Sequence, residues 1–357
     1  MSFRSKISLS KALFLVCLIP FLYACSIGKN SKIVLHPAKT GITTVRYFDK
    51  ARSRPVITEI WYPVQETSQA QPVAGLWLRC PEARDAPLKI GKQKYPLIVM
   101  SHGNGGDRFN ASWIAEILAA NGFIVAAMDH HGNTWNNKIA EFFIKIWERP
   151  LDVSFVIDQI LSDPVFGPHV DAQKIGFVGY SLGGQTGVWL AGGKLGQLDK
   201  SVLKEVPADQ IPNTVTSEML EMIDFSPARE SYKDSRLSAF FLMAPALGFL
   251  FDANSLESIQ TPIYIVAPEG DQIVPIETSP KLLAKTVQRA IYNLIPGSAN
   301  HYVFLNEVTK GGKMILDKAL AFDPPNVDRK KVHEEIGSAA VLFFKDHLNY
   351  YGYKKNK

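Results

Sequence analysis

The chain has few cysteines, no hydrophobic run long enough to cross a membrane, and no large excess of charge of either sign. Three cysteines among 357 residues exclude a small domain held together by several disulfides. The apolar run at residues 12–24 has 13 residues, whereas a membrane-spanning helix needs roughly 20. With 46% hydrophobic and 20% charged residues, the composition is that of a folded protein, and a chain of this length can bury a large core without cross-links.

The net charge of +5 comes from 39 basic and 34 acidic residues. Three of the basic residues, Arg4, Lys6 and Lys11, precede the apolar run in a segment without acidic residues. If this segment is removed from the mature protein, 36 basic residues remain against 34 acidic ones, a net charge of +2. So small an excess creates no basic field that would attract a phosphate backbone, and we expect no binding of nucleic acid.

Residues 1–24 have the pattern of a signal peptide, because positive charges precede a short apolar run that ends in a small residue. The run ends in Ala24, followed by Cys25 and Ser26, which resembles a bacterial lipobox. That resemblance implies cleavage before Cys25, diacylation of Cys25 and an exported protein anchored to a membrane by lipid, with Ser26 favouring the outer membrane. An ordinary cleaved signal peptide and an uncleaved anchor remain alternatives. Residues 25–40 would then form a tether.

After the tether, β-rich and helix-favouring segments alternate, which predicts one α/β domain over residues 41–350. Two strands joined by a turn and six short apolar strands are expected: Thr43–Phe48, Val56–Tyr62, Leu97–Met100, Phe123–Met128, Lys174–Val178, Ala239–Met243, Ile263–Val266 and Ala290–Ile295. The expected helices are Ser112–Ala120, Leu151–Leu161, Leu182–Leu190, Ser279–Gln288 and Arg329–His347. This order predicts a mostly parallel, doubly wound sheet of eight strands. Residues 193–234 interrupt the alternation and are interpreted as an inserted helical cap, and residues 351–357 form a basic tail.

The sharpest motif is Gly179-Tyr180-Ser181-Leu182-Gly183, which follows an expected strand and precedes an expected helix. In this arrangement the serine occupies a tight strand-to-helix turn, and glycines two positions before and after it leave room for the bend. The turn exposes the serine hydroxyl at a helix N-terminus, where developing negative charge is stabilised. We interpret Ser181 as a catalytic nucleophile.

A nucleophilic serine needs a histidine base and a carboxylate that orients the histidine. In strand–turn–helix sites of this kind, both follow the serine in the chain. Of the eight histidines, three do so: His301, His333 and His347. His301 lies in a loop after the last expected strand, whereas the other two lie in the expected C-terminal helix, so His301 is the predicted base. The acid is Glu269 or Asp271, which both follow the strand Ile263–Val266.

An oxyanion site requires backbone N–H donors beside the nucleophile. One donor is expected from Leu182, directly after the serine, and the other from the glycine-rich loop at residues 101–106. Asn104 is the predicted second donor, since the glycines of this loop let the backbone approach a substrate closely. His102 in the same loop is interpreted as structural.

The sequence Asp129-His130-His131-Gly132-Asn133 also follows an expected strand and contains residue types that bind metals. Adjacent residues at a strand end point in opposite directions, however, and no helix supplies an H-E-x-x-H or H-x-x-E-H partner motif. We therefore interpret this segment as a hydrogen-bonding loop at the rim of the site, and we expect neither a metal nor an organic cofactor.

Together these motifs resemble those of the predicted dienelactone hydrolases, a group of α/β-hydrolases related to plasma-type platelet-activating-factor acetylhydrolases and to bacterial polyester-cleaving esterases. The resemblance covers about residues 40–347 and is also carried by residues 52–63, 149–153 and 234–246. It favours Asp271 as the acid, because Asp271-x-x-Val274-Pro275 is similar to the acid loop of many α/β-hydrolases. Genuine dienelactone hydrolases use a cysteine nucleophile, so Ser181 shifts what the resemblance implies to a serine carboxylesterase acting on short-acyl or lipid-like esters.

The predicted reaction is ester hydrolysis through an acyl-enzyme on Ser181. An amidase or acyltransferase with the same triad and a catalytically silent lipoprotein adaptor remain alternatives. The apolar segment Ala244–Phe251, after the sixth expected strand, either packs beneath the cap or lines an acyl pocket.

Overall fold

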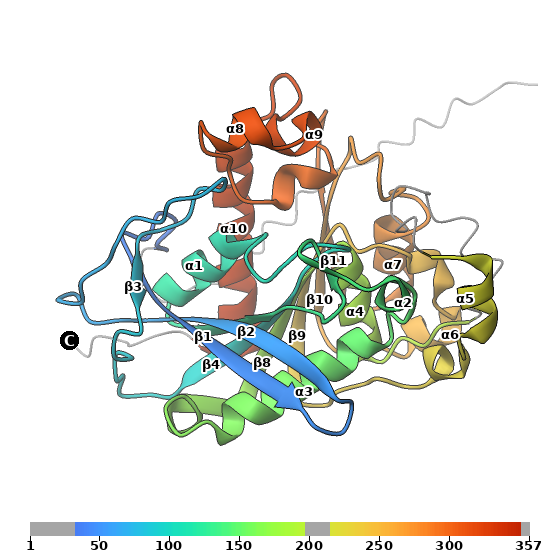
Figure 1. Ribbon diagram of the computed structural model, residues 1–357, viewed down its shortest axis with the longest axis horizontal. Helices are drawn as coiled ribbons and strands as arrows, with labels where there is room; N and C mark the ends of the chain where they lie inside the picture. Colours follow the sequence, from blue (N-terminus) through green and yellow to red (C-terminus); the bar gives the residue numbers. More distant parts are fainter. Residues whose placement is uncertain (1–32, 197–214, 351–357) are drawn as a thin grey trace, which may run out of the picture. The chain divides into compact units, whose positions relative to one another are not determined.

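A computed structural model of the protein describes residues 33–196 and 215–350. The expected signal peptide, residues 25–32 of the tether including Cys25, and the basic tail lie outside the described residues, so the predictions for them stay predictions. The described domain is built around one large sheet with helices on both faces (Figure 1). No helix within this part of the chain is both long and apolar enough to cross a membrane.

The large sheet contains nine strands among the described residues, in the order β11-β10-β9-β8-β4-β5-β2-β1-β3. Their bounds are β1 Thr40–Asp49, β2 Arg54–Tyr62, β3 Glu82–Arg84, β4 Tyr95–Ser101, β5 Ile124–Met128, β8 Val170–Tyr180, β9 Leu237–Met243, β10 Ile263–Pro268 and β11 Ala290–Ile295. The strands from β11 to β5 in this order are parallel, and β2 is antiparallel to both β5 and β1. The eight predicted strands and the mostly parallel α/β architecture are confirmed.

In the large sheet, β3 is the strand that the sequence analysis did not predict. It lies at the edge of the sheet, where Glu82 pairs with Thr40 of β1 in a parallel register. Three residues are too few to show the alternation of apolar and polar side chains that identifies a strand. A separate two-stranded ribbon, β6 Asn133–Thr134 and β7 Asn137–Lys138, was not predicted either, because its strands are shorter still.

The helices are α1 Ser112–Ala120, α2 Ala140–Ile144, α3 Glu148–Ser162, α4 Leu182–Ala191, α5 Ser217–Met222, α6 Ala253–Glu257, α7 Pro280–Thr286, α8 Gly312–Ile315, α9 Lys318–Ala321 and α10 Arg329–His347. The five predicted helices correspond to α1, α3, α4, α7 and α10. The bounds of α1 and α10 are those predicted.

Strand β8 shows how the helices divide between the two faces of the sheet. A Cβ on Gly176 would meet the ring of Phe344 in α10 at 2.6 Å, whereas the ring of Phe177 would meet a Cβ on Gly187 in α4 at 2.7 Å. Because successive residues of a strand point to opposite faces, α10 covers one face and α4 the other. Helix α1 packs with α10, and α3 packs with α4.

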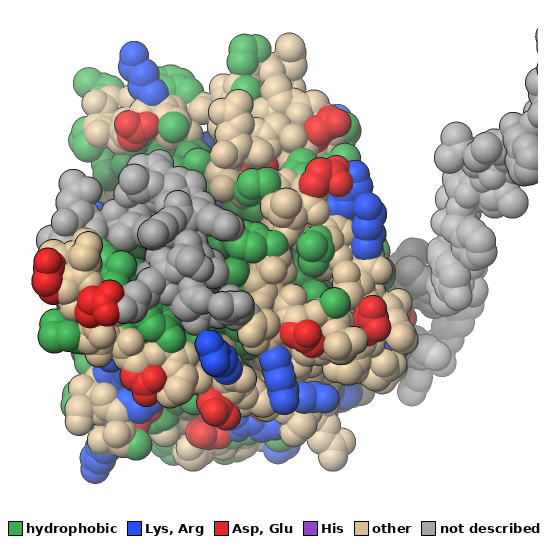
Figure 2. Space-filling model, turned by 90° about the vertical axis from the view of Figure 1, so that its right-hand side faces the viewer, with side chains coloured by type: hydrophobic (Ala, Val, Ile, Leu, Met, Phe, Trp, Pro, Cys, Tyr) green, Lys and Arg blue, Asp and Glu red, His purple; other side chains and the backbone are tan. Residues whose placement is uncertain are grey.

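The expected cap is described only in part. Residues 215–234 contain α5 and the 3₁₀ turn Ser226–Arg229, and the ring of Phe225 packs edge-on against Trp147 at 5.8 Å. Residues 197–214 lie outside the described residues, so a cap over residues 193–234 stays a prediction. On the face that Figure 2 shows, acidic and basic side chains are interspersed rather than gathered by sign.

The core beneath α10 provides a test of the packing. Phe344 is fully buried among the rings of Phe123, Phe241 and Phe343, so Phe344→Ala should lower the free energy of unfolding by about 3–5 kcal/mol. Leu342, on the same helix but 44% exposed, provides the matched control, and Leu342→Ala should change it by less than about 0.5–1 kcal/mol. Urea unfolding measures both, and equal losses would contradict this packing.

Candidate active site

Ser181 lies at the tight turn between β8 and α4, where the motif predicts it. Its backbone has a φ of 55° and a ψ of −117°, a conformation that costs a non-glycine residue about 1–3 kcal/mol. A Cβ on Gly179 would lie 2.3 Å from the carbonyl oxygen of Gly183, and a Cβ on Gly183 would lie 2.0 Å from the carbonyl oxygen of Ser101. Gly179 is needed because the turn folds back on its own backbone, and Gly183 because the turn lies against the end of β4.

His301 and Asp271 form a hydrogen-bonded chain with Ser181. The Oγ of Ser181 lies 3.0 Å from the Nε2 of His301, and the Nδ1 of His301 lies 2.7 Å from the Oδ2 of Asp271. The side chains of His301 and Asp271 are only 4% and 1% exposed, so water screens their interaction little. The three residues follow β8, β10 and β11, whose carboxyl ends meet at one edge of the parallel sheet.

The two candidate acids have different environments. The Oδ1 of Asp271 accepts hydrogen bonds from the amides of Ile273 and Val274 at 2.9 and 2.8 Å, which leaves Oδ2 directed at the histidine. Glu269 is exposed and accepts a hydrogen bond from the amide of Gly297 at 2.7 Å. The structure therefore brings Asp271, and not Glu269, to the histidine.

The two predicted oxyanion donors lie on either side of the turn. Leu182 is the first residue of α4, a position where helix geometry gives the N–H group no intrahelical partner. The loop after β4 packs on the serine, since a Cβ on Gly103 would lie 3.2 Å from the Cβ of Ser181. Asn104 follows directly, so its N–H group belongs to the same peptide plane as the carbonyl of Gly103. Their action as donors stays a prediction.

A second serine–histidine–aspartate chain, which the sequence reasoning missed, begins at the end of β4. The Oγ of Ser101 lies 2.8 Å from the Nε2 of His130, whose Nδ1 lies 2.8 Å from the Oδ2 of Asp152. All three residues are buried, with exposures of 3%, 1% and 0%. Burial, together with the positive charge of Arg149, lowers the pKa of His130 well below its ordinary value, so the ring is neutral near pH 7.

The surroundings of this second chain indicate a structural role. Ser101 ends an extended strand rather than occupying a strained turn before a helix. The carboxylate of Asp152 also binds Arg52 at 2.9 Å and Arg54 at 3.0 Å, so the β1–β2 hairpin, β4 and α3 are joined through one buried group. Residues 52–63 and 149–153 carried the family resemblance, but separations of 22 to 98 residues in the sequence gave no sign that they meet.

The segment Asp129–Asn133 is a hydrogen-bonding loop in the structure. The Oδ1 of Asp129 accepts a hydrogen bond from the amide of Arg108, and the Oδ1 of Asn133 accepts one from the amide of Gly105, both at 2.8 Å. Within residues 33–196 and 215–350, no group of three or more His, Cys, Asp or Glu side chains is arranged to hold a metal ion.

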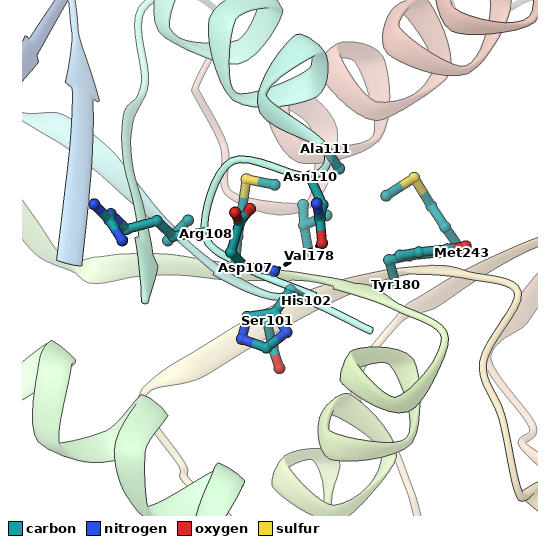
Figure 3. Close-up of a pocket in the computed structure, with 11 residues that line it drawn as sticks. Ser101, His102, Asp107, Arg108, Asn110, Ala111, Val178, Tyr180 and Met243 are labelled. Carbon is teal, nitrogen blue, oxygen red and sulfur yellow. Dashed lines mark hydrogen bonds between the residues drawn. The ribbon is translucent and has the colours of Figure 1, made fainter. Parts of the chain in front are cut away.

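A small cavity lies at the end of β4 and is lined in part by the loop that follows this strand (Figure 3). Its volume is about 10 Å³, room for about one water molecule, and its lining includes Ser101, His102, Asp107, Arg108 and Tyr180. None of the three residues of the Ser181 chain lines it. The cavity is therefore too small and wrongly placed to receive an ester.

The two phenylalanines of the segment Ala244–Phe251 differ in exposure, and whether the segment lines an acyl pocket stays a prediction. Phe251 is buried, and its ring packs against Trp189 at 6.1 Å, whereas Phe249 is 40% exposed. The amide of Ala246 donates to the carbonyl oxygen of Ser181 at 3.1 Å, so this segment borders the serine turn. Phe251 therefore belongs to the core, and Phe249 is the exposed ring of this segment.

Comparison with solved structures identifies the fold. A ferulic acid esterase from Streptomyces cinnamoneus superposes with a TM-score of 0.59 and 16% sequence identity, covering 90% of this chain and 93% of that one. The nine-stranded, mostly parallel sheet and this similarity show that the chain has an α/β-hydrolase fold.

Comparison of sequences finds similarity to one family over part of the chain. The model of platelet-activating factor acetylhydrolase, isoform II, matches residues 53–143. The acetylhydrolases of Cavia porcellus and Canis lupus familiaris are 49% and 54% identical over 53 and 46 residues, which are 15% and 13% of this chain. The matched segments span only 12% and 10% of those two proteins. Residues 53–143 contain the loop at residues 101–106 but not Ser181, Asp271 or His301.

The two serine chains can be distinguished by covalent labelling. A fluorophosphonate should modify Ser181 and not Ser101, because Ser181 lies in a strained turn at the N-terminus of α4 beside the predicted oxyanion donors, whereas Ser101 ends an extended strand. Peptide mass spectrometry locates the adduct, and Ser181→Ala should abolish it. An adduct on Ser101 would show that the roles are reversed.

Proposed function

We propose that this protein is a serine carboxylesterase. Ser181 attacks the ester carbonyl while the Nε2 of His301 accepts the proton of its hydroxyl, and Asp271 orients the ring and stabilises the imidazolium that forms. The amides of Leu182 and Asn104 stabilise the oxyanion. His301 returns the proton to the leaving alcohol and then activates the water that releases the acyl group.

The observation that carries this proposal is the hydrogen-bonded chain from Ser181 through His301 to Asp271 at a strained strand-to-helix turn. Strain at a single serine persists only where the surrounding structure enforces it, and such residues cluster at active sites. The proposed nucleophile Ser181, acid Asp271 and base His301 follow one another along the chain in the order typical of α/β-hydrolases.

The proposed substrates are esters with a short acyl group or a lipid-like body. Support comes from the family match over residues 53–143, whose named members are acetylhydrolases. The exposed ring of Phe249 near the serine turn is a candidate contact for an apolar substrate group. An amidase or acyltransferase would use the same triad, and adding an alcohol acceptor to the assay would reveal acyl transfer as a transesterification product.

A panel of p-nitrophenyl esters from acetate to octanoate tests the activity. The wild-type protein should hydrolyse at least one of them, and Ser181→Ala should lower kcat on the order of 10⁴–10⁶-fold, because the hydroxyl is the only group lost. Asp271→Asn should reduce kcat far more than Glu269→Gln, since only Asp271 contacts the histidine. Near-wild-type turnover by Ser181→Ala, or the reverse ranking of the acid variants, would refute the assignment.

We further propose that the chain is exported and anchored to a bacterial membrane by lipid on Cys25. The proposal rests on the basic residues, the 13-residue apolar run and the Ala24-Cys25-Ser26 sequence that follows it. Cys25→Ser should abolish labelling by an alkyne-tagged fatty acid and move the protein from the membrane fraction to the soluble one. Unchanged membrane association with an intact N-terminus would instead support an uncleaved anchor.

A further inference from the structure

One buried guanidinium holds the backbone of the loop after β4. Arg149, near the start of α3, donates from Nη1 to the carbonyl oxygen of His102 at 2.7 Å and from Nη2 to that of Gly103 at 3.1 Å. Its Nη2 also donates to the Oδ1 of Asn133 at 2.9 Å, and the same oxygen accepts from the amide of Gly105 at 2.8 Å. A single planar fork therefore fixes two successive peptide groups of the loop directly and a third through Asn133.

These bonds determine where the N–H groups of the loop point. In a planar trans peptide the C=O and N–H groups point in opposite directions. Since the carbonyls of His102 and Gly103 point at Arg149, the N–H groups of Gly103 and Asn104 point away from it. The carbonyl oxygen of Gly103 also accepts from the Nδ1 of His102 at 2.7 Å and from the amide of Gly106 at 3.3 Å. Successive N–H groups directed to one side form a concave site for an anion.

The loop that is held in this way is the one that packs on the proposed nucleophile. A Cβ on Gly103 would lie 3.2 Å from the Cβ of Ser181, and the carbonyl of Ser101 touches the turn at Gly183. The orientation of the Gly103 peptide therefore determines which backbone groups lie beside Ser181.

The charged guanidinium of Arg149 is buried. Arg149 is only 2% exposed, and the salt bridges recorded among the described residues do not include it. Burial lowers its pKa to about 9, an effect that nearby Asp152 opposes. A buried charge carries a desolvation cost, and the hydrogen bonds that offset it at Arg149 are those to the loop carbonyls and to Asn133.

We propose that Arg149 is a positioning residue of the oxyanion site: by holding the carbonyls of His102 and Gly103, it turns the N–H groups of Gly103 and Asn104 toward the oxyanion that forms at Ser181. The proposal rests on the proposed esterase function. A lysine cannot perform this task, because one ammonium nitrogen cannot reproduce a planar fork that spans two carbonyls and an amide oxygen.

The test is the kinetics of Arg149→Lys with an ester that the wild-type protein hydrolyses. Donors that act on the oxyanion stabilise the transition state and not bound substrate, so kcat should fall about 10- to 100-fold, less than the 10²–10³-fold typical of losing a donor outright. The KM should change by less than about threefold, and the Kd of a trifluoromethyl ketone, which forms an oxyanion adduct with the serine, should rise in parallel with the fall in kcat/KM.

Active-site titration with a fluorophosphonate separates positioning from loss of folded protein. A merely structural role for Arg149 would reduce the number of titratable sites and leave kcat per site and the Kd of the ketone unchanged, and that result would overturn the proposal. Arg149→Gln, which removes the charge and the fork that spans the carbonyls of His102 and Gly103, should reproduce the kinetic signature if Arg149→Lys does not fold. A normal kcat per site in that variant would also overturn it.

Arg236→Lys provides the matched control. Arg236 also uses its fork to bind a carboxylate, that of Asp234, and a backbone carbonyl, that of Ser154, but it makes no recorded hydrogen bond to the loop after β4. This variant should keep kcat, KM and the Kd of the ketone. A wild-type protein that hydrolyses no ester would overturn both the proposed function and this inference, whereas an active enzyme with normal kinetics in Arg149→Lys would overturn the inference alone.

Discussion

The contact between the backbone of the serine turn and the end of β4 is the constraint on which the site depends. The space between Gly183 and the carbonyl of Ser101 cannot hold even one methyl group. That proximity places the loop after β4 against Ser181, and it lets two neighbouring strands present backbone groups to the same small volume. The hydroxyl of Ser181, the start of α4 and the loop can therefore act on one carbonyl only because the strands are adjacent and both turns are rich in glycine.

Two hydrogen-bonded chains of serine, histidine and aspartate lie in the described part of the molecule, and each serine follows or ends a strand of the large sheet. One chain begins at a strained serine at a helix N-terminus, and the other begins at an extended serine whose aspartate is shared with Arg52 and Arg54. The chemistry available to each is decided by its surroundings and not by its composition. Geometry between side chains is therefore insufficient to assign a nucleophile, and backbone conformation supplies the missing criterion.

Local patterns predicted the elements whose determinants are local. The buried strands, α1, α10 and the turn at Ser181 follow from apolar runs, helix periodicity and glycine spacing, which a single stretch of sequence contains. The choice of Asp271 over Glu269 depended on family resemblance, since both follow the same strand. Its physical reason, the two amides that fix Oδ1, is visible only in the folded loop.

What the sequence could not predict depends on contacts between distant residues. Strand β3 exists because β1 offers it an edge, and a buried tie such as Asp152 with Arg54 joins residues 98 positions apart. A charged residue in the first turn of a helix, such as Arg149, is ordinarily expected to be solvated. Only the packing of α3 against the loop after β4 makes it an internal donor.

The separation of the site residues along the chain has a consequence for the order of folding. Ser181 and His301 are 120 positions apart, and His301 and Asp271 are 30 apart. Closing such long loops costs entropy before the contacts repay it, which makes non-local sites slow to form. A growing chain that ends before β11 can build the serine turn and its strained backbone but lacks the imidazole. The hydrogen-bonded chain from Ser181 to Asp271 can therefore be completed only after β11 has joined the sheet, when nearly all of the sheet has formed.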